Sequence, residues 1–397
     1  MHTEPDEKRL NDLAARRFPL VARPQVISRP IPVRISQIET RAAQAQQGGP
    51  DTITRAAEAL NLAALLASDV GTPEAARDLC WRQFAQFQNA ARPLPVATAQ
   101  LALQPLINLA RLHTRAGHGR TAFDLLHELF AAVINQTAVK LDGHLIDLAG
   151  FTRPGDDHTE LRTWLWQVFL IDGTNALARA GEWNHALHYV DQLHGIVHNL
   201  GEGRQIAILA HALGRQPNQG LDLLRASRTG GPWEQTVALC LTALCLQAGG
   251  HSTDKELEQI TDTFLELDRE PALATATGRL GLAALELQYG QLRADAPRIT
   301  QRLWEIGMEP GGGYVARDLL QHHMSASLSE GRRQDLVAAV RLAGLDGSGL
   351  SADFESRLLA AADASTAALE RDLRLAADLQ ARHLPAGSHR PGSPAGC

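Results

Sequence analysis

The sequence predicts an all-α fold, an α-solenoid of repeated helix pairs that carries a short β-hairpin-like insertion. Three observations lead to this prediction. Almost the whole chain between its ends places apolar residues at i, i+3, i+4 and i+7, the period of amphipathic helices. Short Gly-containing breaks separate these runs, and stretches of the sequence match one another at a distance. Such repetition is typical of stacked helical units that share one continuous core.

The expected helices follow one another with only short connections. They cover residues 54–70, 73–90, 97–116, 120–136, 161–180, 183–199, 203–213, 219–227, 234–248, 255–267, 271–289, 296–306, 314–328 and, at the end of the array, 352–383. Apart from these, the segment 17–34 carries four prolines and no helical period, so it is expected to be extended across the body.

This pattern divides the chain into four parts. We expect an N-terminal helix and Pro-rich extended segment over 1–50, and a solenoid over 51–330. Capping helices are expected over 331–384. The tail 385–397 is rich in Gly, Pro and Ser and is predicted to be disordered.

Internal repetition is the most specific signal in the sequence. Residues 106–126 align without a gap with residues 170–190, at an offset of 64, and an earlier copy lies 46 residues upstream of the first. The identical pairs are Leu106/Leu170, Ile107/Ile171, Arg115/Arg179, Ala116/Ala180, Gly117/Gly181 and Ala122/Ala186. Each copy therefore reads as a helix, a Gly turn and a second helix.

Small residues recur at the same two places in these copies. One lies midway along the first helix and one at the start of the second; they are Ala64, Ala110, Thr174 and Ala76, Ala122, Ala186. Close approach of two antiparallel helices needs small side chains at the crossing point. We expect all six to be buried where paired helices cross.

The inter-helix phrases TRAGHGRTAFDLL, ARAGEWNHALHYV and LGRQPNQGLDLL resemble the tetratricopeptide repeat, and Gly181, Gly214 and Gly249 are 33 and 35 residues apart. The resemblance covers residues 54–304 and implies a right-handed solenoid whose concave groove binds peptides or proteins. Lys255 and Asp295 replace the small Ala in the later copies, and large aromatics are scarce. The repeats are therefore degenerate.

One segment departs from the helical pattern. Residues 138–148 alternate in character around Asp142-Gly143, which is a type I′ hairpin signal. It lies in an insertion, 136–160, that accounts for the 64-residue offset. Insertions in solenoids fall on one face. This one is interpreted either as the functional part of the protein or as a surface loop or dimer contact.

Composition narrows the function classes. The formal charge is −6, which argues against direct nucleic-acid binding, and there is no apolar run long enough for a membrane span. The charged N-terminus does not read as a secretory signal and four Cys do not form a disulfide framework, so we expect a cytoplasmic protein. The 35 Arg against 3 Lys indicate a G+C-rich, bacterial genome.

The sequence offers little for catalysis. Of the 16 His, four lie on one expected helix but on opposite faces, so they predict no zinc site. Phosphate-loop and G-x-S-x-G motifs are absent, and Asp156-Asp157-His158 is read as the start of a helix. We expect no cofactor and no metal, and an enzyme is the less favoured interpretation.

The candidate ligand-binding residues are polar side chains on the first helices of successive pairs, which would line the groove. They are Asn61, Gln104, Asn108, Arg111, Arg115, Asp172, Asn175 and Arg179. Asn amides can hold a peptide backbone, and Arg forks can hold carboxylates. An ordinary solvated helix face explains the stripe equally well. Trp164, Trp166, Trp183 and Tyr189 would add an apolar anchor or belong to the core.

We therefore expect a non-catalytic, regulatory recognition scaffold that binds a peptide, a protein partner or a small acidic ligand in its groove. One alternative is an accessory protein or enzyme of a biosynthetic pathway that acts through the insertion 136–160. A second is a ligand sensor that works with a partner's DNA-binding domain. A homodimer through the terminal helices is a further alternative.

Overall fold

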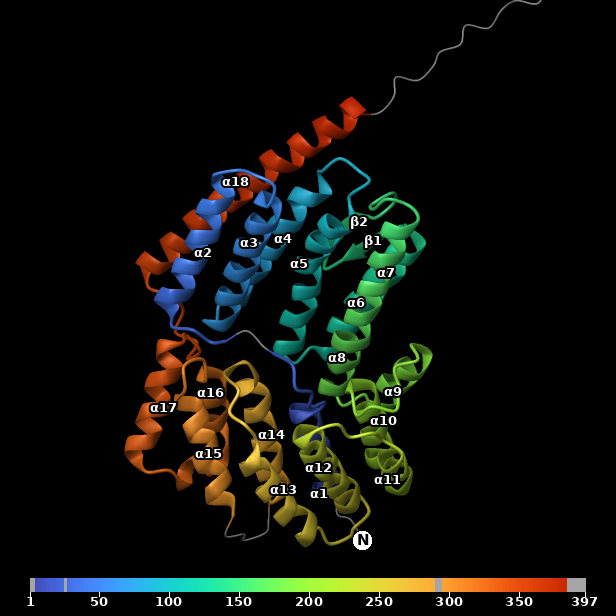
Figure 1. The fold of residues 1–397 in the computed structure, drawn as a ribbon, viewed down its shortest axis with the longest axis vertical. Helices are drawn as coiled ribbons and strands as arrows, with labels where there is room; N and C mark the ends of the chain where they lie inside the picture. The colour runs from blue at the N-terminus through green and yellow to red at the C-terminus, as the bar shows by residue number, and fades with distance from the viewer. Residues whose placement is uncertain (1–3, 25–26, 290–294, 384–397) are drawn as a thin grey trace, which may run out of the picture.

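The computed structural model describes residues 4–24, 27–289 and 295–383, so the tail predicted to be disordered lies outside the described residues. The described chain is mostly helical, with one two-stranded antiparallel sheet. Helices adjacent in sequence pack on one another along the chain (Figure 1). The prediction of an all-α protein of repeated helix pairs is confirmed at this level.

The elements before residue 200 are α1 (Glu4–Arg17), α2 (Ile31–Gln46), α3 (Thr52–Asp69), α4 (Pro73–Gln88), α5 (Val96–Arg115), α6 (Gly119–Asn135), β1 (Ala138–Leu141), β2 (His144–Asp147), α7 (Asp156–Val168), the π-helix η1 (Phe169–Gly173), α8 (Thr174–Arg179) and α9 (Trp183–Gln192). Those after it are α10 (Glu202–Leu213), α11 (Pro217–Arg225), α12 (Pro232–Ala248), α13 (Asp254–Glu266), the 3₁₀ turn η2 (Pro271–Leu273), α14 (Ala274–Leu287), α15 (Ala296–Met308), α16 (Gly313–Gln321), the 3₁₀ turn η3 (His323–Ser327), α17 (Glu330–Leu342) and α18 (Ala352–His383).

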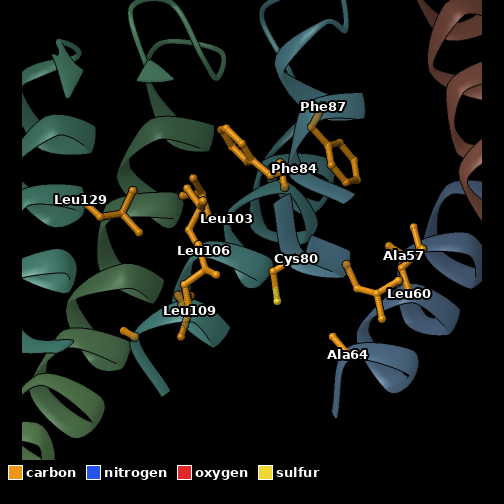
Figure 2. Packing of buried hydrophobic residues seen from close by; sticks show 14 of the residues in the cluster. Ala57, Leu60, Ala64, Cys80, Phe84, Phe87, Leu103, Leu106, Leu109 and Leu129 are labelled. Carbon is orange, nitrogen blue, oxygen red and sulfur yellow. The ribbon is translucent and has the colours of Figure 1, made fainter. Parts of the chain in front are cut away.

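The buried side chains form two hydrophobic cores, which define two stacks of helices. The first stack contains α2 to α8 together with α18, and the second contains α10 to α17 together with α1. Figure 2 shows side chains of α3, α4, α5 and α6 that meet in the first core, among them Leu60, Phe84 and Leu106. The two stacks lie one above the other in Figure 1.

The six small residues of the repeat are buried, as the sequence predicted. Ala64, Ala110 and Thr174 on the first helices, and Ala76, Ala122 and Ala186 on the second helices, are all buried. Gly119 shows how closely the helices approach, because a Cβ added there would lie 2.2 Å from the carbonyl oxygen of Ala176. Only small side chains fit such contacts, which explains why the repeat conserves size rather than polarity from copy to copy.

The insertion forms the predicted hairpin. Strands β1 and β2 pair in antiparallel register, and the two turn residues Asp142 and Gly143 both have positive φ, as a type I′ turn requires. The ring of His144 stacks on Trp81 of α4 at 3.9 Å between centroids, and Asp142 pairs with Arg77. The hairpin is thus packed on the second helix of the first pair.

The expected helix over 161–180 is interrupted. One turn of π-helix, Phe169–Gly173, separates α7 from α8. The Thr174 hydroxyl donates to the backbone oxygen of Leu170 inside this turn, and the ring of Phe169 lies against Gly173. A π-turn inserts one extra residue into the helix and rotates the side chains after it. Periodicity alone does not reveal such a change.

Helix α1 lies on the inner layer of the second stack, where it contacts α8, α10, α12 and α14. Its apolar residues Leu10, Leu13 and Ala14 are buried in the second core. The indole nitrogen of Trp183 donates to Asn11 at 2.7 Å. An amphipathic helix of the chain itself therefore occupies the groove of this stack.

Between α1 and α2, residues 18–24 and 27–30 have no helical structure (Figure 1). Gln205 of α10 makes two hydrogen bonds to the backbone of Leu20, at 2.7 and 2.8 Å. Ser28 pairs by isolated bridges with Gly311 and Gly312 before α16. The segment is thereby attached to the second stack at both of its ends.

Helix α18 brings the end of the array back to its beginning. It packs across α2, α3 and α4, and Arg357 holds Glu39 of α2 through two hydrogen bonds of 2.8 Å. The Gly349 amide donates to the Val70 carbonyl at 2.9 Å. The last helix of the described chain thus covers the first helix pair.

Arg17 at the end of α1 is bound by Glu286 of α14, whose Oε1 accepts from its Nε and Nη2 at 2.9 and 2.7 Å. Beside this pair, His322 is 4% exposed and its Nδ1 accepts from the Met324 amide at 3.2 Å. Its Nε2 lies 4.0 Å from Oε1 of Glu286 and has no hydrogen-bond partner in the part of the chain that the structure describes. Burial, and then the neighbouring charges of His323, Arg17 and Arg16, lower the pKa of His322 to about 3.

Replacing Ala122 by Leu should lower the free energy of unfolding by about 1–3 kcal/mol, because the larger side chain overpacks the crossing of α5 and α6. Urea unfolding measures the change. Ala367→Leu, at an exposed position of α18, is the control and should shift stability by less than about 0.5 kcal/mol. Equal effects of the two substitutions would show that the crossing point is not tightly packed.

His322 should make the protein less stable in mild acid. Its folded pKa lies below the unfolded value of about 6.5, so only the unfolded chain takes up this proton as the pH falls. Between pH 7 and pH 5 the loss from this group should be about 2 kcal/mol. His322→Gln, whose amide oxygen can still accept from Met324, should lose less stability over that interval. If urea unfolding shows that the unmodified protein and His322→Gln lose the same stability between pH 7 and pH 5, His322 is not the group responsible.

Candidate functional site

The inner face of the first stack carries most of the predicted polar stripe. Asn108 of α5 is its centre: its amide nitrogen donates to Asn61 of α3, and its oxygen accepts from Gln104 at 3.2 Å. Arg111 holds Asp172 of η1 through two hydrogen bonds of 3.2 and 2.8 Å. The stripe is therefore one hydrogen-bonded network that runs from α3 across α5 to η1.

Asp172 and Asn108, which the repeat aligns, are joined through Arg111, whose Nη1 also donates to Asn108 at 3.4 Å. The Arg111 side chain remains 47% exposed. A ligand that binds here would replace hydrogen bonds and ion pairs within the stripe that water already screens. The stripe by itself is therefore a polar surface and not a formed pocket.

Arg115 leaves the stripe and turns toward α3. Its Nη1 donates to the Ser68 hydroxyl at 2.7 Å and to Asp69 at 3.1 Å. The Asp69 side chain is 2% exposed and also accepts from Arg34 of α2 at 2.8 Å and from the hydroxyl of Tyr314 of α16 at 2.6 Å. Burial and the Asp69 charge raise the pKa of Tyr314.

This Asp69 cluster joins the two stacks, and sequence reasoning missed it. Asp69 ends a helix and gives no periodic signal, because its partners lie on α2, α5 and α16. The only hint was Tyr314, one of 3 Tyr in the chain, at the start of a predicted helix.

Arg179, which the repeat aligns with Arg115, has different surroundings. It ends α8, and desolvation together with the charge of Arg17 lowers the pKa of its guanidinium. Asn175, one turn earlier, is half-buried. The sequence placed Arg115 and Arg179 side by side, whereas one binds Asp69 of the first stack and the other lies near the end of α1.

A cavity of about 800 Å³ lies between α2, α3 and the segment before α2. Its lining is apolar and cationic: Ile27, Arg29, Pro32, Val33, Arg34, Ser36, Gln37, Ile38, Thr40, Arg41, Leu62 and Leu65. Leu62 follows Asn61 of the stripe, and Arg34 belongs to the Asp69 cluster. The cavity and the stripe therefore share helix α3, and the cavity and the Asp69 cluster share Arg34.

The charge of this cavity is positive. Its lining contains three arginines and no carboxylate. Arg34 is neutralised by Asp69, and Arg41 pairs with Glu58 at 3.1 Å in a half-exposed contact. Arg29 is exposed and forms no ion pair with any residue that the structure describes. The combination of a hydrophobic floor and arginines at its edge suits an acidic, partly apolar ligand.

The insertion uses its side chains for packing. A cavity near it measures only about 10 Å³, enough for a water molecule. Asp156 and Asp157 begin α7, and burial and Arg162 lower the pKa of His158. Within residues 4–24, 27–289 and 295–383, no group of three His, Cys, Asp or Glu is placed to hold a metal ion.

Three of the four aromatic residues considered as an anchor lie in or against the cores, and the fourth, Trp166, is half-buried. Trp183 is 5% exposed, and Trp164 and Tyr189 pack on the first core, where Tyr189 contacts Phe123 at 4.7 Å between ring centroids. No helix within the described residues is long and apolar enough to cross a membrane. No family model matches the chain, and comparisons with curated proteins and with solved structures give no match either.

Replacing Asp69 by Asn should lower the free energy of unfolding by about 3–5 kcal/mol, because buried Arg34 loses its counter-charge. Asp222→Asn is the matched control: its side chain is 70% exposed beside Arg225, and the change should stay within about 0.5 kcal/mol. Chemical denaturation of both variants gives the comparison. A mild effect at Asp69 would mean that the cluster does not hold the stacks together.

Proposed function

We propose that the protein is a non-catalytic recognition scaffold that binds an acidic peptide segment of a partner protein on the inner face of its first stack. The observation that carries the proposal is the 800 Å³ cavity with apolar and cationic lining, which shares helix α3 with Asn61 of the stripe. An apolar side chain of the peptide would enter between Val33, Leu62 and Leu65. Its carboxylates would lie at Arg29 and Arg41.

The second stack supports this mode of binding. Its inner layer holds α1, an amphipathic helix whose apolar face is buried and whose charged residues bind at the edge. The first stack has a more polar inner face, at which the cavity remains open. The chain itself thus provides an example of a peptide segment seated on such helix pairs.

Specificity would come from charge. Arginine forks pair with carboxylates through two parallel hydrogen bonds, and exposed Arg29 has the freedom to do so. The amides of Asn61, Gln104 and Asn108, with Asn175 beyond them, can satisfy a peptide backbone. A basic peptide would meet Arg29, which forms no ion pair with any described residue, and would find no carboxylate in the cavity lining. We therefore place acidic partners ahead of other ligands, including small acidic molecules.

The finer features expected from the sequence belong to this proposal. They are a right-handed solenoid of the tetratricopeptide type, a regulatory role in a bacterial cytoplasm, and binding of protein rather than of nucleic acid or membrane. The packed state of the hairpin, with Asp142 held by Arg77 and His144 stacked on Trp81, favours a supporting role for the insertion.

The proposal predicts binding of a fluorescein-labelled octapeptide pool rich in Asp, Glu, Leu and Phe, measured by fluorescence anisotropy. The same pool with Gln in place of Asp and Glu should bind at least about tenfold more weakly, because it lacks charge-assisted hydrogen bonds. Val33→Asp places a negative charge in the cavity and should weaken binding of the acidic pool by at least about tenfold.

Val337→Asp is the matched control, since Val337 is 43% exposed on α17 and Val33 is 42% exposed on α2. It should leave the affinity unchanged. Equal affinities of the Val33 and Val337 variants would remove the cavity from the binding site. If neither the acidic pool nor the Gln pool binds, the proposed function is overturned.

A further inference from the structure

The end of α18 extends past the other helices of the first stack (Figure 1). Arg371 still reaches this stack, because its Nη2 donates to the carbonyl of Ala45, one residue before the end of α2, at 3.2 Å. Beyond Arg371, Leu375 is 53% exposed and Leu379 is 55% exposed. This part of α18 therefore presents an apolar surface that α2 does not cover.

The exposed leucines continue the face by which α18 packs on the stack. Residues seven apart on a helix lie on nearly the same side of it. In one such row, Ala361 and Ala368 are buried and Leu375 is exposed. In a second row, Ser365 is buried and Leu379, fourteen residues later, is exposed. The side of the helix that is buried on the first stack thus becomes exposed where the helix passes the end of α2.

The end of α18 also carries an exposed carboxylate. The two carboxylates before it are held by arginines of the same helix, Glu370 by Arg374 and Asp372 by Arg371. Asp378 is exposed and forms no ion pair with any residue that the structure describes. The surface therefore combines apolar side chains with one negative charge.

The cavity between α2 and α3 has the complementary character. Val33 in its lining is 42% exposed, and exposed Arg29 forms no ion pair within the described chain. Leu375, Asp378 and Leu379 are spaced i, i+3 and i+4, as in amphipathic helices that bind in hydrophobic grooves. A carboxylate beside two leucines is an acidic, partly apolar ligand of the kind that this lining suits.

The helix end cannot fill the cavity of its own chain. It leaves α2 at Ala45 and continues beyond it, whereas α2 contributes residues 32–41 to the cavity. In a second copy, a twofold axis perpendicular to α2 places the end of one α2 beside the start of the other. Each α18 end then lies next to the cavity of the other copy, and two identical contacts form together.

We propose that the partner bound in the cavity is a second copy of this chain. Its α18 inserts Leu375 and Leu379 between α2 and α3 and places Asp378 at Arg29. This inference rests on the proposed function, because it takes the same cavity as the receiving surface and names its occupant. Each contact is small, so two of them hold a dimer that dissociates in the micromolar range. Acidic peptides compete with the helix end for the cavity.

Sedimentation equilibrium of the full chain between about 1 and 100 µM tests the dimer. Leu375→Asp should weaken dimerisation at least about tenfold, because it places a charge against the apolar lining. Leu359→Asp is the matched control: Leu359 is 49% exposed on the same helix, about 160° around the axis from Leu375, and its change should leave the dimer intact. A chain that stays monomeric, or equal effects of the two substitutions, overturns the proposal.

A charge exchange tests the predicted pair directly. Arg29→Asp and Asp378→Arg should each weaken the dimer at least about tenfold, because each brings like charges together. The double variant should regain most of the lost affinity. A double variant as weak as the single ones would show that α18 does not bind at Arg29.

The acidic octapeptide pool separates this inference from the proposed function. The pool should bind Leu375→Asp more tightly than the unmodified protein, because no helix end competes for the cavity. Equal binding by the two chains, with a monomeric protein, refutes the inference and leaves the proposed function standing. A dimer that the charge exchange restores, without binding of the pool to either chain, supports the inference and overturns the proposed function.

Discussion

The buried carboxylate of Asp69 is the contact on which the arrangement of the two stacks depends. It accepts hydrogen bonds from Arg34 on α2, Arg115 on α5 and Tyr314 on α16, and so it joins three helices that are far apart in the sequence. A buried carboxylate is stable only when such donors surround it. Because Arg34 also lines the cavity, the same contact fixes one wall of the candidate binding surface.

The two inner faces of the solenoid are used differently, and the physical reason is their polarity. The inner layer of the second stack is apolar enough to need a cover, which α1 and the residue after it provide by burying Leu10, Leu13 and Phe18. The inner face of the first stack carries the amide and arginine stripe, which is stable in water. One inner face is therefore covered by a helix of the chain itself, and the other carries a polar stripe.

Arginine supplies nearly all cations of this chain, and the structure places many of them between the stacks. Where a carboxylate is at hand, as at Asp69 and Glu286, the guanidinium fork ties helices together. Arg279 instead donates to the backbone oxygen of Arg17, and its Nε has no hydrogen-bond acceptor among the described residues. The same side chain thus serves as a structural link in one place and as an unsatisfied charge in another.

The sequence by itself determined the helices, the small residues at their crossings and the hairpin, because each depends on neighbours within a few turns. The periodic apolar positions, the buried Ala76, Ala122 and Ala186, and the turn at Asp142-Gly143 are local signals. Only the tertiary structure decided that α1 packs on the inner layer of the second stack and that α18 covers the first helix pair. It also decided that Arg115 and Arg179, which the repeat aligns, have different surroundings. These outcomes depend on which faces of distant helices meet, and on the rotation that the π-turn adds before α8. No repeat period encodes that choice, because it is set by packing and charge pairing across the whole chain.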